Sequence, residues 1–136
     1  MNEQINQKTS EQPQPSQVPD IILRADEIKF APFNIPGFSG ETHAAFPNTD
    51  ISKAPFIALL RMKPGAVLRK HFHPTVAEAV YVVEGEMIND GEILPAGSFL
   101  IHGAGVVHGP HATEKGCTLM FIQSSPVGKD DSVFVD

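Results

Sequence analysis

The sequence predicts an all-β domain, a sandwich or barrel built from short strands. Glycine and proline recur every few residues from position 20 onward, which leaves little room for helices. The runs between these breaks are short and rich in β-branched and aromatic residues, as strands are. Four runs carry the prediction: PFIALLRM at 55–62, EAVYVVEGEM at 78–87, SFLIH at 98–102 and TLMFIQ at 118–123. Strands of this length and spacing are typical of all-β sandwiches and barrels.

The segments of the chain differ in how much apolar surface they can bury. Residues 1–20 contain five glutamines and three prolines but few apolar side chains, so we expect a polar tail there and the folded barrel domain at 21–136. A short helical turn is expected at 25–28. The stretch ALLRM at 58–62 is apolar at both alternating positions, which predicts a strand that is central or covered on both faces.

The length and charge of the chain limit the number of cores it can form and the kinds of partner it can bind. A chain of 136 residues has room for one core. Its formal net charge of −6 argues against a nucleic acid or an anionic membrane as partner, because both attract basic surfaces. A small molecule or a protein remains as the expected partner.

Cys117 is the single cysteine, so no internal disulfide forms, and we expect it to be a small buried residue. The first residues lack the apolar stretch of a signal peptide, and no run is long enough to span a membrane, so a cytoplasmic location is expected.

Two histidines and a glutamate stand at a spacing typical of a metal site. His71 and His73 are two residues apart, so on a strand their side chains leave the same face, roughly 6 to 7 Å apart. A short loop follows, and Glu78 is expected to open the antiparallel partner of that strand. Histidines two apart also occur by chance on surfaces, but chance does not explain Glu78 and the flanking Gly65 and Gly85 at their spacing. The metal interpretation is therefore preferred.

A second segment, PAGSFLIHGAGVVHGPHA at 95–112, completes a resemblance to the cupin family. Cupins carry the motifs G-x5-H-x-H-x3-4-E-x6-G and G-x5-P-x-G-x2-H-x3-N. The first motif is matched at every fixed position, and the second at Gly97, Gly105 and His108. Gly103 stands where proline is usual and Ala112 where asparagine is usual, which leaves the orientation of His108 open.

The resemblance implies a double-stranded β-helix, the jelly-roll barrel of the cupins, and a homodimer. It also implies one divalent metal ion near one end of the barrel. Carried over position by position, the ligands are His71, His73, Glu78 and His108. Three imidazoles and one carboxylate suit Fe, Mn, Ni, Zn or Cu, and the sequence does not choose among these metals.

Other residues of the region have their own expectations. His111 is the candidate catalytic residue, as an acid/base group or as a group that supports the ligands, and a solvated loop histidine is the alternative. His102 is expected at the rim or in the core rather than on the metal. Alternation along the strand from 78 places Val80 and Val82 inside the barrel and Tyr81 outside. Three more residues are core or pocket candidates: Phe99, Met62 and Phe121.

The segment HGPHATEKGCTLMFI at 108–122 resembles small single-domain cupins such as acetylacetone-cleaving dioxygenases and the cupin domain of zinc-binding anti-sigma factors. Two hypotheses follow from this resemblance. The first is a metal-dependent dioxygenase acting on a small dicarbonyl or enol, with an isomerase that uses the same Lewis-acid step as its variant. The second is a non-catalytic sensor of a metal or ligand. An apolar pocket would favour a dicarbonyl or aromatic substrate, whereas Arg61, Arg69 or Lys70 inside it would favour an acid or sugar phosphate.

Overall fold

The computed structural model describes residues 21–34, 36–48, 56–128 and 131–136. The expected polar tail at 1–20 and the first residue of the run at 55–62 lie outside these ranges. The expected helical turn is present as a 3-10 turn at Ala25–Glu27. Every other element within the described ranges is a strand: β1 (Ala31–Pro32), β2 (Phe38–Ser39), β3 (Thr42–Ala45), β4 (Phe56–Met62), β5 (Val67–Leu68), β6 (His71–Phe72), β7 (Glu78–Asn89), β8 (Glu92–Pro95), β9 (Phe99–His102), β10 (His111–Ala112), β11 (Cys117–Gln123) and β12 (Val133–Phe134). The all-β prediction is confirmed.

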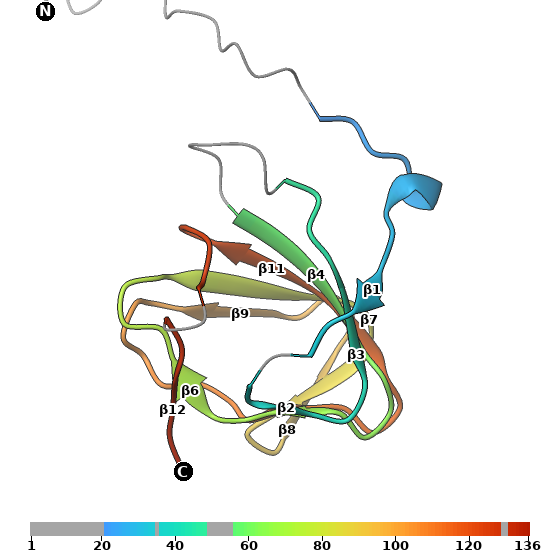
Figure 1. Cartoon of the computed structure of the whole chain (residues 1–136). Coiled ribbons are helices and arrows are strands. Elements are labelled where there is room, and N and C mark those ends of the chain that lie inside the picture. Colours follow the sequence, from blue (N-terminus) through green and yellow to red (C-terminus); the bar gives the residue numbers. More distant parts are fainter. Residues whose placement is uncertain (1–20, 35, 49–55, 129–130) are drawn as a thin grey trace, which may run out of the picture.

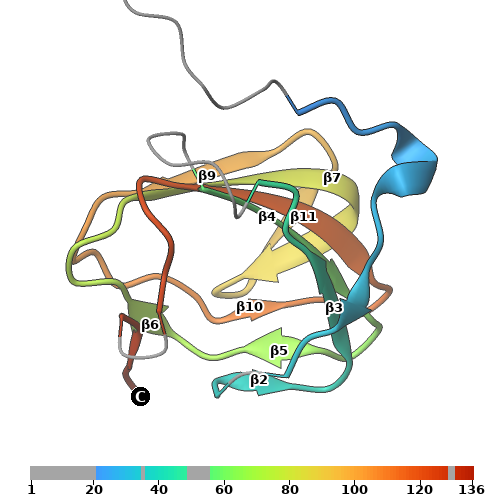
Figure 2. The same ribbon diagram turned by 45° about the horizontal axis from the view of Figure 1, so that its top comes forward.

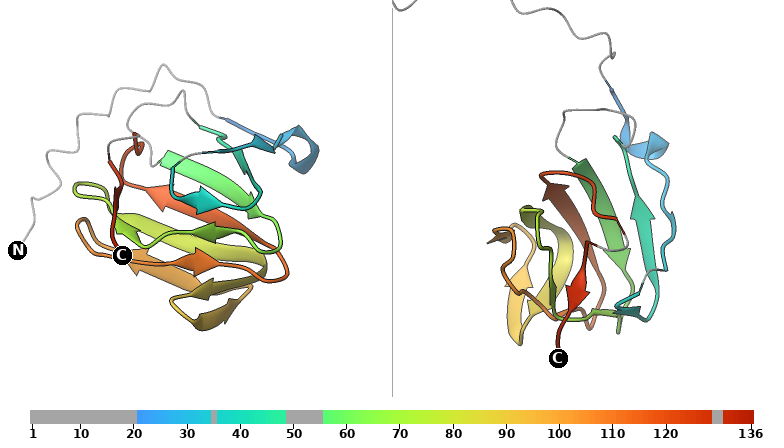
Figure 3. Two further views of the ribbon diagram at one scale, coloured as in Figure 1. Left: turned by 60° about the horizontal axis from the view of Figure 1, so that its bottom comes forward. Right: turned by 60° about the vertical axis from the view of Figure 1, so that its left-hand side comes forward.

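The strands form a curled antiparallel sheet (Figure 1). Its order is β1-β3-β4-β11-β7-β10-β5-β2, and β8 and β9 both pair with β7. A separate two-stranded ladder joins β6 to β12. The sheet wraps into two facing layers, which Figure 2 shows one above the other and Figure 3 shows from two further directions. β4, β11, β7 and β9 lie in one layer, and β2, β5, β10 and β8 in the other. Segments from both ends of the chain therefore close a common interior.

β7 links the two layers because it changes partners along its length. Its first half pairs with β9 and β11, and its second half with β8 and β10. The register against β11 shifts by one residue at Val83, which makes a bulge and bends the strand. Gly85 follows with a φ of 75°, and a Cβ at this position would collide with the carbonyl oxygen of Gly116. Glycine is therefore required where the strand turns from one layer into the other.

One sequence-based expectation about pairing is wrong. Glu78 does open a strand, but β7 is not the partner of the histidine strand. β6 pairs instead with β12 from the end of the chain, with Phe134 opposite His71. The backbone of His71 is also bridged to that of His108. The histidine strand therefore pairs with segments far from it in the sequence and does not form the local hairpin that the spacing suggested.

The core lies between the layers and follows the predicted alternation. Val80 and Val82 are fully buried, and Tyr81 lies on the outside with its ring centroid 4.6 Å from that of Phe99. Met62 and Phe121 are buried as expected, and so is Cys117. Phe99 is not a core residue, because 59% of its surface is exposed. The outer side of β7 and β9 thus carries two aromatic side chains, Tyr81 and Phe99, that do not pack into the core.

Candidate metal centre

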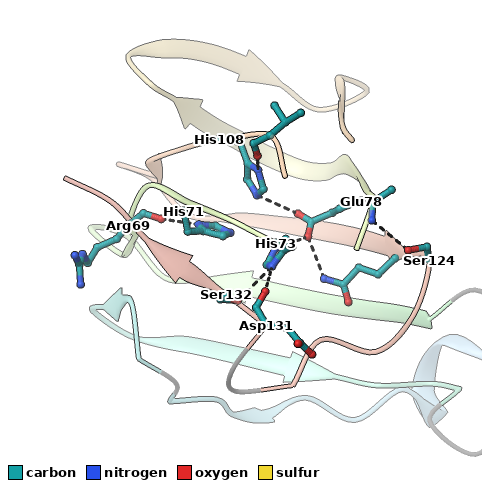
Figure 4. Close-up of polar contacts among 11 residues, drawn as sticks. Arg69, His71, His73, Glu78, His108, Ser124, Asp131 and Ser132 are labelled. Atoms are coloured by element: carbon teal, nitrogen blue, oxygen red, sulfur yellow. Dashed lines mark hydrogen bonds and ion pairs between the residues drawn. The ribbon is translucent and has the colours of Figure 1, made fainter. Parts of the chain in front are cut away.

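The structure brings the four sequence-predicted ligands together at one end of the barrel interior (Figure 4). The ligand atoms of His71, His73 and His108 all lie within 4.8 Å of one another. A carboxylate oxygen of Glu78 is 3.1 Å from Nε2 of His73, and its other oxygen is 3.9 Å from Nε2 of His108. All four side chains are buried. The two motifs therefore meet in a single cluster of three imidazoles and one carboxylate.

Backbone hydrogen bonds hold the two histidine segments against each other. The N–H of His71 donates to the carbonyl of His108 at 2.9 Å, and the N–H of His108 donates back to His71 at 2.8 Å. The N–H of Gly105 donates to the carbonyl of His73 at 2.7 Å. The unusual residue Gly103 therefore does not displace His108, since the main chain on both sides of the turn fixes its position.

Each of the three imidazoles is oriented through its Nδ1 atom. His71 bonds the carbonyl oxygen of Arg69 at 2.7 Å, His73 that of Asp131 at 3.0 Å, and His108 that of Val106 at 2.9 Å. A carbonyl oxygen only accepts, so each Nδ1 carries the proton and donates. In the neutral ring the lone pair is then on Nε2, which points into the cluster. The rings are thus set in the tautomer that a metal ligand needs.

Glu78 is flanked by polar residues on the two strands beside it, and Gln123 donates a hydrogen bond to it. The side-chain Nε2 of Gln123 donates to Oε1 of Glu78 at 3.0 Å, and β11 places Gln123 directly opposite Glu78. On the other side, β9 places His102 opposite Glu78. Sequence reasoning missed Gln123, which is a polar residue at the end of an otherwise apolar strand. The only sign of it in the sequence was a polar residue at the end of an apolar run. Its position beside Glu78 depends on the register between β11 and β7, which the sequence does not reveal.

The electrostatics keep two of the imidazoles neutral. Burial lowers the pKa of His71 to about 4 and also lowers the pKa of His108. Burial acts in the same direction on His73, but its hydrogen bonds to Glu78 and to the carbonyl of Asp131 outweigh it and raise the pKa of His73. Burial would raise the pKa of Glu78, and its hydrogen bonds with His73 and Gln123 lower it instead. These two pKa shifts therefore favour a protonated His73 beside an ionised Glu78, whose Oε1 lies 3.1 Å from Nε2 of His73.

This donor set fits a divalent transition-metal ion. Oε2 of Glu78 and Nε2 of His108 are buried, and neither has a hydrogen-bond partner in the described part of the chain. Buried polar atoms without partners are rare, and a bound ion is one way to satisfy them. Mixed imidazole and carboxylate ligands suit Fe, Mn, Ni, Zn or Cu. The cluster supports a metal without identifying it.

Two further histidines lie behind this set. The ring of His102 stacks on that of His108, with centroids 4.0 Å apart and planes 4° from parallel. His111 is 1% exposed, so its interpretation as a solvated loop residue is wrong. Neither ring nitrogen of His111 has a hydrogen-bond partner among the described residues, and burial lowers its pKa to about 3. The ligand atoms of His102, His108 and His111 form a second group within 4.8 Å, which sequence reasoning did not anticipate.

A cavity of about 300 Å³ opens beside the cluster. Its polar end is formed by His71, His73 and Glu78, with Gln123 and Ser132 nearby, and most of its wall is apolar. Six phenylalanines line it: Phe33, Phe38, Phe46, Phe56, Phe121 and Phe134. No arginine or lysine is among the lining residues that the structure describes. His102, His108 and His111 are not among the described lining residues either.

The basic residues singled out in the sequence lie elsewhere. The guanidinium of Arg61 stacks on the ring of Phe30 at 4.0 Å. That of Arg69 lies 5.1 Å from the ring centroid of Phe134 and contacts Asp136 on the surface. Among the described lining residues, none supplies the fixed positive charge that an acid or a sugar phosphate would require.

Comparison with known proteins settles the family. A family model described as the ChrR cupin-like domain matches residues 19–127, which is most of the chain. The chain belongs to this cupin family. The resemblance inferred from the two motifs is thereby confirmed.

Solved structures of other cupin-like proteins agree with the fold. An acetylacetone dioxygenase from Acinetobacter johnsonii is 14% identical, with 92% of this chain and 89% of that one covered at a TM-score of 0.67. The polyketide cyclase RemF from Streptomyces resistomycificus is 17% identical, with 85% and 84% covered and a TM-score of 0.67. KdgF from Halomonas sp. is 20% identical, with 84% and 98% covered and a TM-score of 0.63. At these identities the likeness establishes the jelly-roll barrel and not the reaction.

Two other findings concern this cupin as a whole. A search among curated protein sequences gives no match. Within the described ranges, no helix has the length and apolar character needed to cross a membrane.

Proposed function

We propose that this cupin is a metal-dependent dioxygenase that acts on a small, uncharged dicarbonyl or enol in the cytoplasm, as a homodimer. The observation that carries the proposal is the cavity, which joins an apolar wall of six phenylalanines to a polar end of His71, His73 and Glu78. Such a wall favours an uncharged substrate, and the polar end is where its oxygen atoms would bind. The described lining residues offer no counter-ion for a carboxylate or phosphate.

The proposed ligands are His71, His73, Glu78 and His108, around one ion of Fe, Mn, Ni, Zn or Cu. When bound, the ion would supply Lewis-acid binding of two substrate oxygens and access to O₂. The protein's own residues orient the three imidazoles through backbone carbonyls and hold Glu78 through Gln123. The phenylalanine wall would exclude water from the substrate.

His111 has a supporting role in this proposal. It does not line the cavity, and a pKa of about 3 makes its imidazole a weak base. Its ring centroid lies 6.0 Å from that of His71 and 5.6 Å from that of His108. We therefore assign His111 to packing behind the ligands rather than to proton transfer with substrate.

The test is oxygen uptake by protein stripped of metal and reloaded with Fe(II), using a panel of β-dicarbonyls that includes acetylacetone. The expected result is one O₂ consumed for each dicarbonyl cleaved, with both oxygen atoms recovered in the products. The matched control is Glu78→Gln, which removes the carboxylate but preserves the side-chain shape. Product formed without oxygen uptake would show an isomerase. Bound zinc in protein purified without added metal, with no turnover under any metal loading, would show the sensor and overturn the enzyme.

A further inference from the structure

Residues 131–136 lie at the polar end of the cavity and contact the metal centre from a distant part of the sequence. The carbonyl oxygen of Asp131 accepts the hydrogen bond from Nδ1 of His73 at 3.0 Å, and Oγ of Ser132 lies 3.3 Å from the same nitrogen (Figure 4). Ser132 and Phe134 also line the cavity. We call residues 131–136, which include β12, the strap.

His73 differs from the other two candidate ligand imidazoles in the origin of its acceptor. Those two donate to carbonyls only two residues before them, so their own loops orient them. Asp131 lies 58 residues away from His73 in the sequence, and the strap brings it to the site. Displacement of the strap would therefore release His73 and leave the other two imidazoles oriented.

The strap is attached more weakly than the strands of the barrel. β12 pairs with β6 in a ladder of two residue pairs, which is separate from the ten-stranded sheet (Figure 1). None of the six strap residues is buried. An isolated two-stranded ladder has only marginal stability in water, and segments with few buried contacts open without unfolding of the whole protein. The strap can therefore open while the barrel stays folded.

Phe134 is the anchor of the strap. Its ring centroid lies 5.7 Å from that of His71, and the guanidinium of Arg69 lies 5.1 Å from it on the surface. The ring occupies the space beside Gly37, where a Cβ would collide with it. The ion pair between Arg69 and Asp136 is exposed, and such pairs contribute little. Attachment of the strap therefore depends mainly on one aromatic ring seated against a glycine.

We propose that the strap couples metal binding to closure of the cavity. This inference rests on the ligand role that the proposed function gives His73, and it adds a segment that moves with that ligand. When Nε2 of His73 binds an ion, Nδ1–H of the same ring becomes a stronger donor, so its hydrogen bond to the carbonyl of Asp131 strengthens. By reciprocity, closure of the strap raises the affinity of the site for the ion by the same factor.

The coupling has a consequence for the cavity. With the strap open, Ser132 and Phe134 leave the wall, and the polar end of the cavity is accessible from outside. With the strap closed, both side chains complete the wall and enclose what the cavity holds, which keeps water from it. The metal-free protein therefore favours entry, and the metal-bound protein favours enclosure.

The first test is hydrogen–deuterium exchange of the wild-type chain with and without Zn(II). The N–H of Val135 donates to the carbonyl of Lys70 at 3.0 Å, so the amides of the strap report its closure. Bound zinc should slow their exchange by about 10- to 100-fold, the usual effect of such a hydrogen-bond partner on metal affinity. The exposed strand β8 is the internal control and should exchange at an unchanged rate. Equal slowing of β8 and the strap would indicate general stabilisation and overturn the coupling.

A glycine pair tests the reverse direction, from strap to metal. Gly37→Ala places a methyl group against the ring of Phe134 without changing a ligand or a strap residue. Gly97→Ala is the matched control, because the φ angles are 99° and 96° but a Cβ at Gly97 meets nothing within 4 Å. We expect Gly37→Ala to speed strap exchange in the metal-free protein and to weaken Zn(II) binding by about 10- to 100-fold. Gly97→Ala should bind Zn(II) within about threefold of wild type, as measured by competition with a chromophoric chelator.

A second pair removes the anchor and avoids backbone strain. Phe134→Ala should reproduce the loss of Zn(II) affinity seen in Gly37→Ala. Phe134→Leu should restore most of that affinity, because it refills the space beside Gly37 with an apolar side chain. Circular dichroism of each metal-free variant checks that the barrel is folded. Equal affinity in the two Phe134 variants, both well below wild type, would show that the aromatic contact with His71 matters instead of strap docking, and would overturn the coupling.

His73→Leu separates failure of the coupling from failure of the proposed ligand set. It should reduce Zn(II) affinity by at least about 100-fold and abolish the effect of zinc on strap exchange. If it binds Zn(II) as wild type does, the ligand set and the coupling are both overturned. Tight Zn(II) binding by wild type with unchanged strap exchange, or wild-type affinity in both Gly37→Ala and Phe134→Ala, overturns the coupling and leaves the ligand set standing.

Discussion

The five clustered histidines fall into two groups that differ in how their rings are held. His71, His73 and His108 each donate Nδ1–H to a backbone carbonyl, which leaves Nε2 on the opposite edge of each ring, and Nε2 of His73 contacts Glu78. The ligand atoms of His102 and His111 lie within 4.8 Å of that of His108 and of each other, yet in the described part of the structure no carbonyl is found to orient either ring. Proximity alone therefore does not make a ligand. The difference indicates that the motif histidines are preorganised for metal and that the other two fill space behind them.

The two groups of histidines also differ in how their replacement affects protein stability and metal binding. A buried imidazole with both nitrogens unpaired is unfavourable, and an apolar replacement of similar shape removes that penalty. An anchored ligand cannot be replaced in this way, because its loss leaves a gap in the coordination of the ion. The predictions below test the distinction, beginning with the substitutions for which it predicts the largest contrast.

The sharpest contrast is between His71→Leu and His111→Leu. We expect His71→Leu to weaken metal binding by at least about 100-fold, beyond the loss that removal of a supporting residue causes. His111→Leu should leave affinity within about threefold of wild type and should not lower thermal stability, because it removes two unpaired polar atoms. Competition with a chromophoric chelator and thermal unfolding measure the two quantities. Equal metal loss in both variants would show that His111 is a ligand and would remove the distinction between the groups.

Gln123→Leu tests whether the carboxylate depends on its support as the imidazoles do. Glu78 would lose the donor that lies 3.0 Å from Oε1 and keep its other neighbours. We expect metal affinity to fall by about 10- to 100-fold, the usual effect of losing such a partner. Ser124→Ala is the control, since this neighbouring side chain accepts a hydrogen bond from the N–H of Ala77 and does not touch the cluster. If both variants bind metal as wild type does, Gln123 has no part in the site.

The clustering of the candidate ligands could be predicted from sequence because motif spacing encodes it directly. His71, His73 and Glu78 lie within one short segment, and a fixed glycine marks the turn before His108. The four apolar runs likewise predicted β4, β7, β9 and β11, the strands that build the inner core. These features depend on near neighbours in the chain, and local alternation is sufficient to read them.

What could not be predicted depends on register between distant segments. Gln123 and His102 belong to the site because β11 and β9 place them on either side of Glu78. Strands of two residues, such as β5 and β10, have no periodicity of their own and form only because the barrel pairs them. Phe33 and Phe38 reach the cavity from a glycine- and proline-rich stretch that carries no strand pattern. Packing, and not local preference, places these residues.

The pH dependence of metal binding tests the protonation states of the anchored group. The pKa of His73 is raised above its ordinary 6.5, whereas burial lowers the pKa of His71 to about 4 and also lowers that of His108. As pH falls, His73 is therefore the first ligand to gain a proton, and the ion must displace it. Affinity should fall about tenfold per pH unit once pH drops below the raised pKa of His73, since one proton is exchanged per ion. Isothermal titration in two buffers counts the protons released, and a count near three at pH 6 would contradict this assignment.

The smallest effect is expected for His102→Phe, which removes both ring nitrogens and keeps a flat ring stacked on His108. That stacking, with planes 4° from parallel, does not set the orientation of His108, because the carbonyl of Val106 already holds its Nδ1. Metal affinity should change by less than about threefold while the aromatic contact is preserved. His43→Phe is the matched control, as His43 pairs with Glu41 away from the cluster. A loss above about tenfold in His102→Phe alone would place His102 among the ligands, since a flat ring without donor atoms differs from histidine mainly in what it can coordinate.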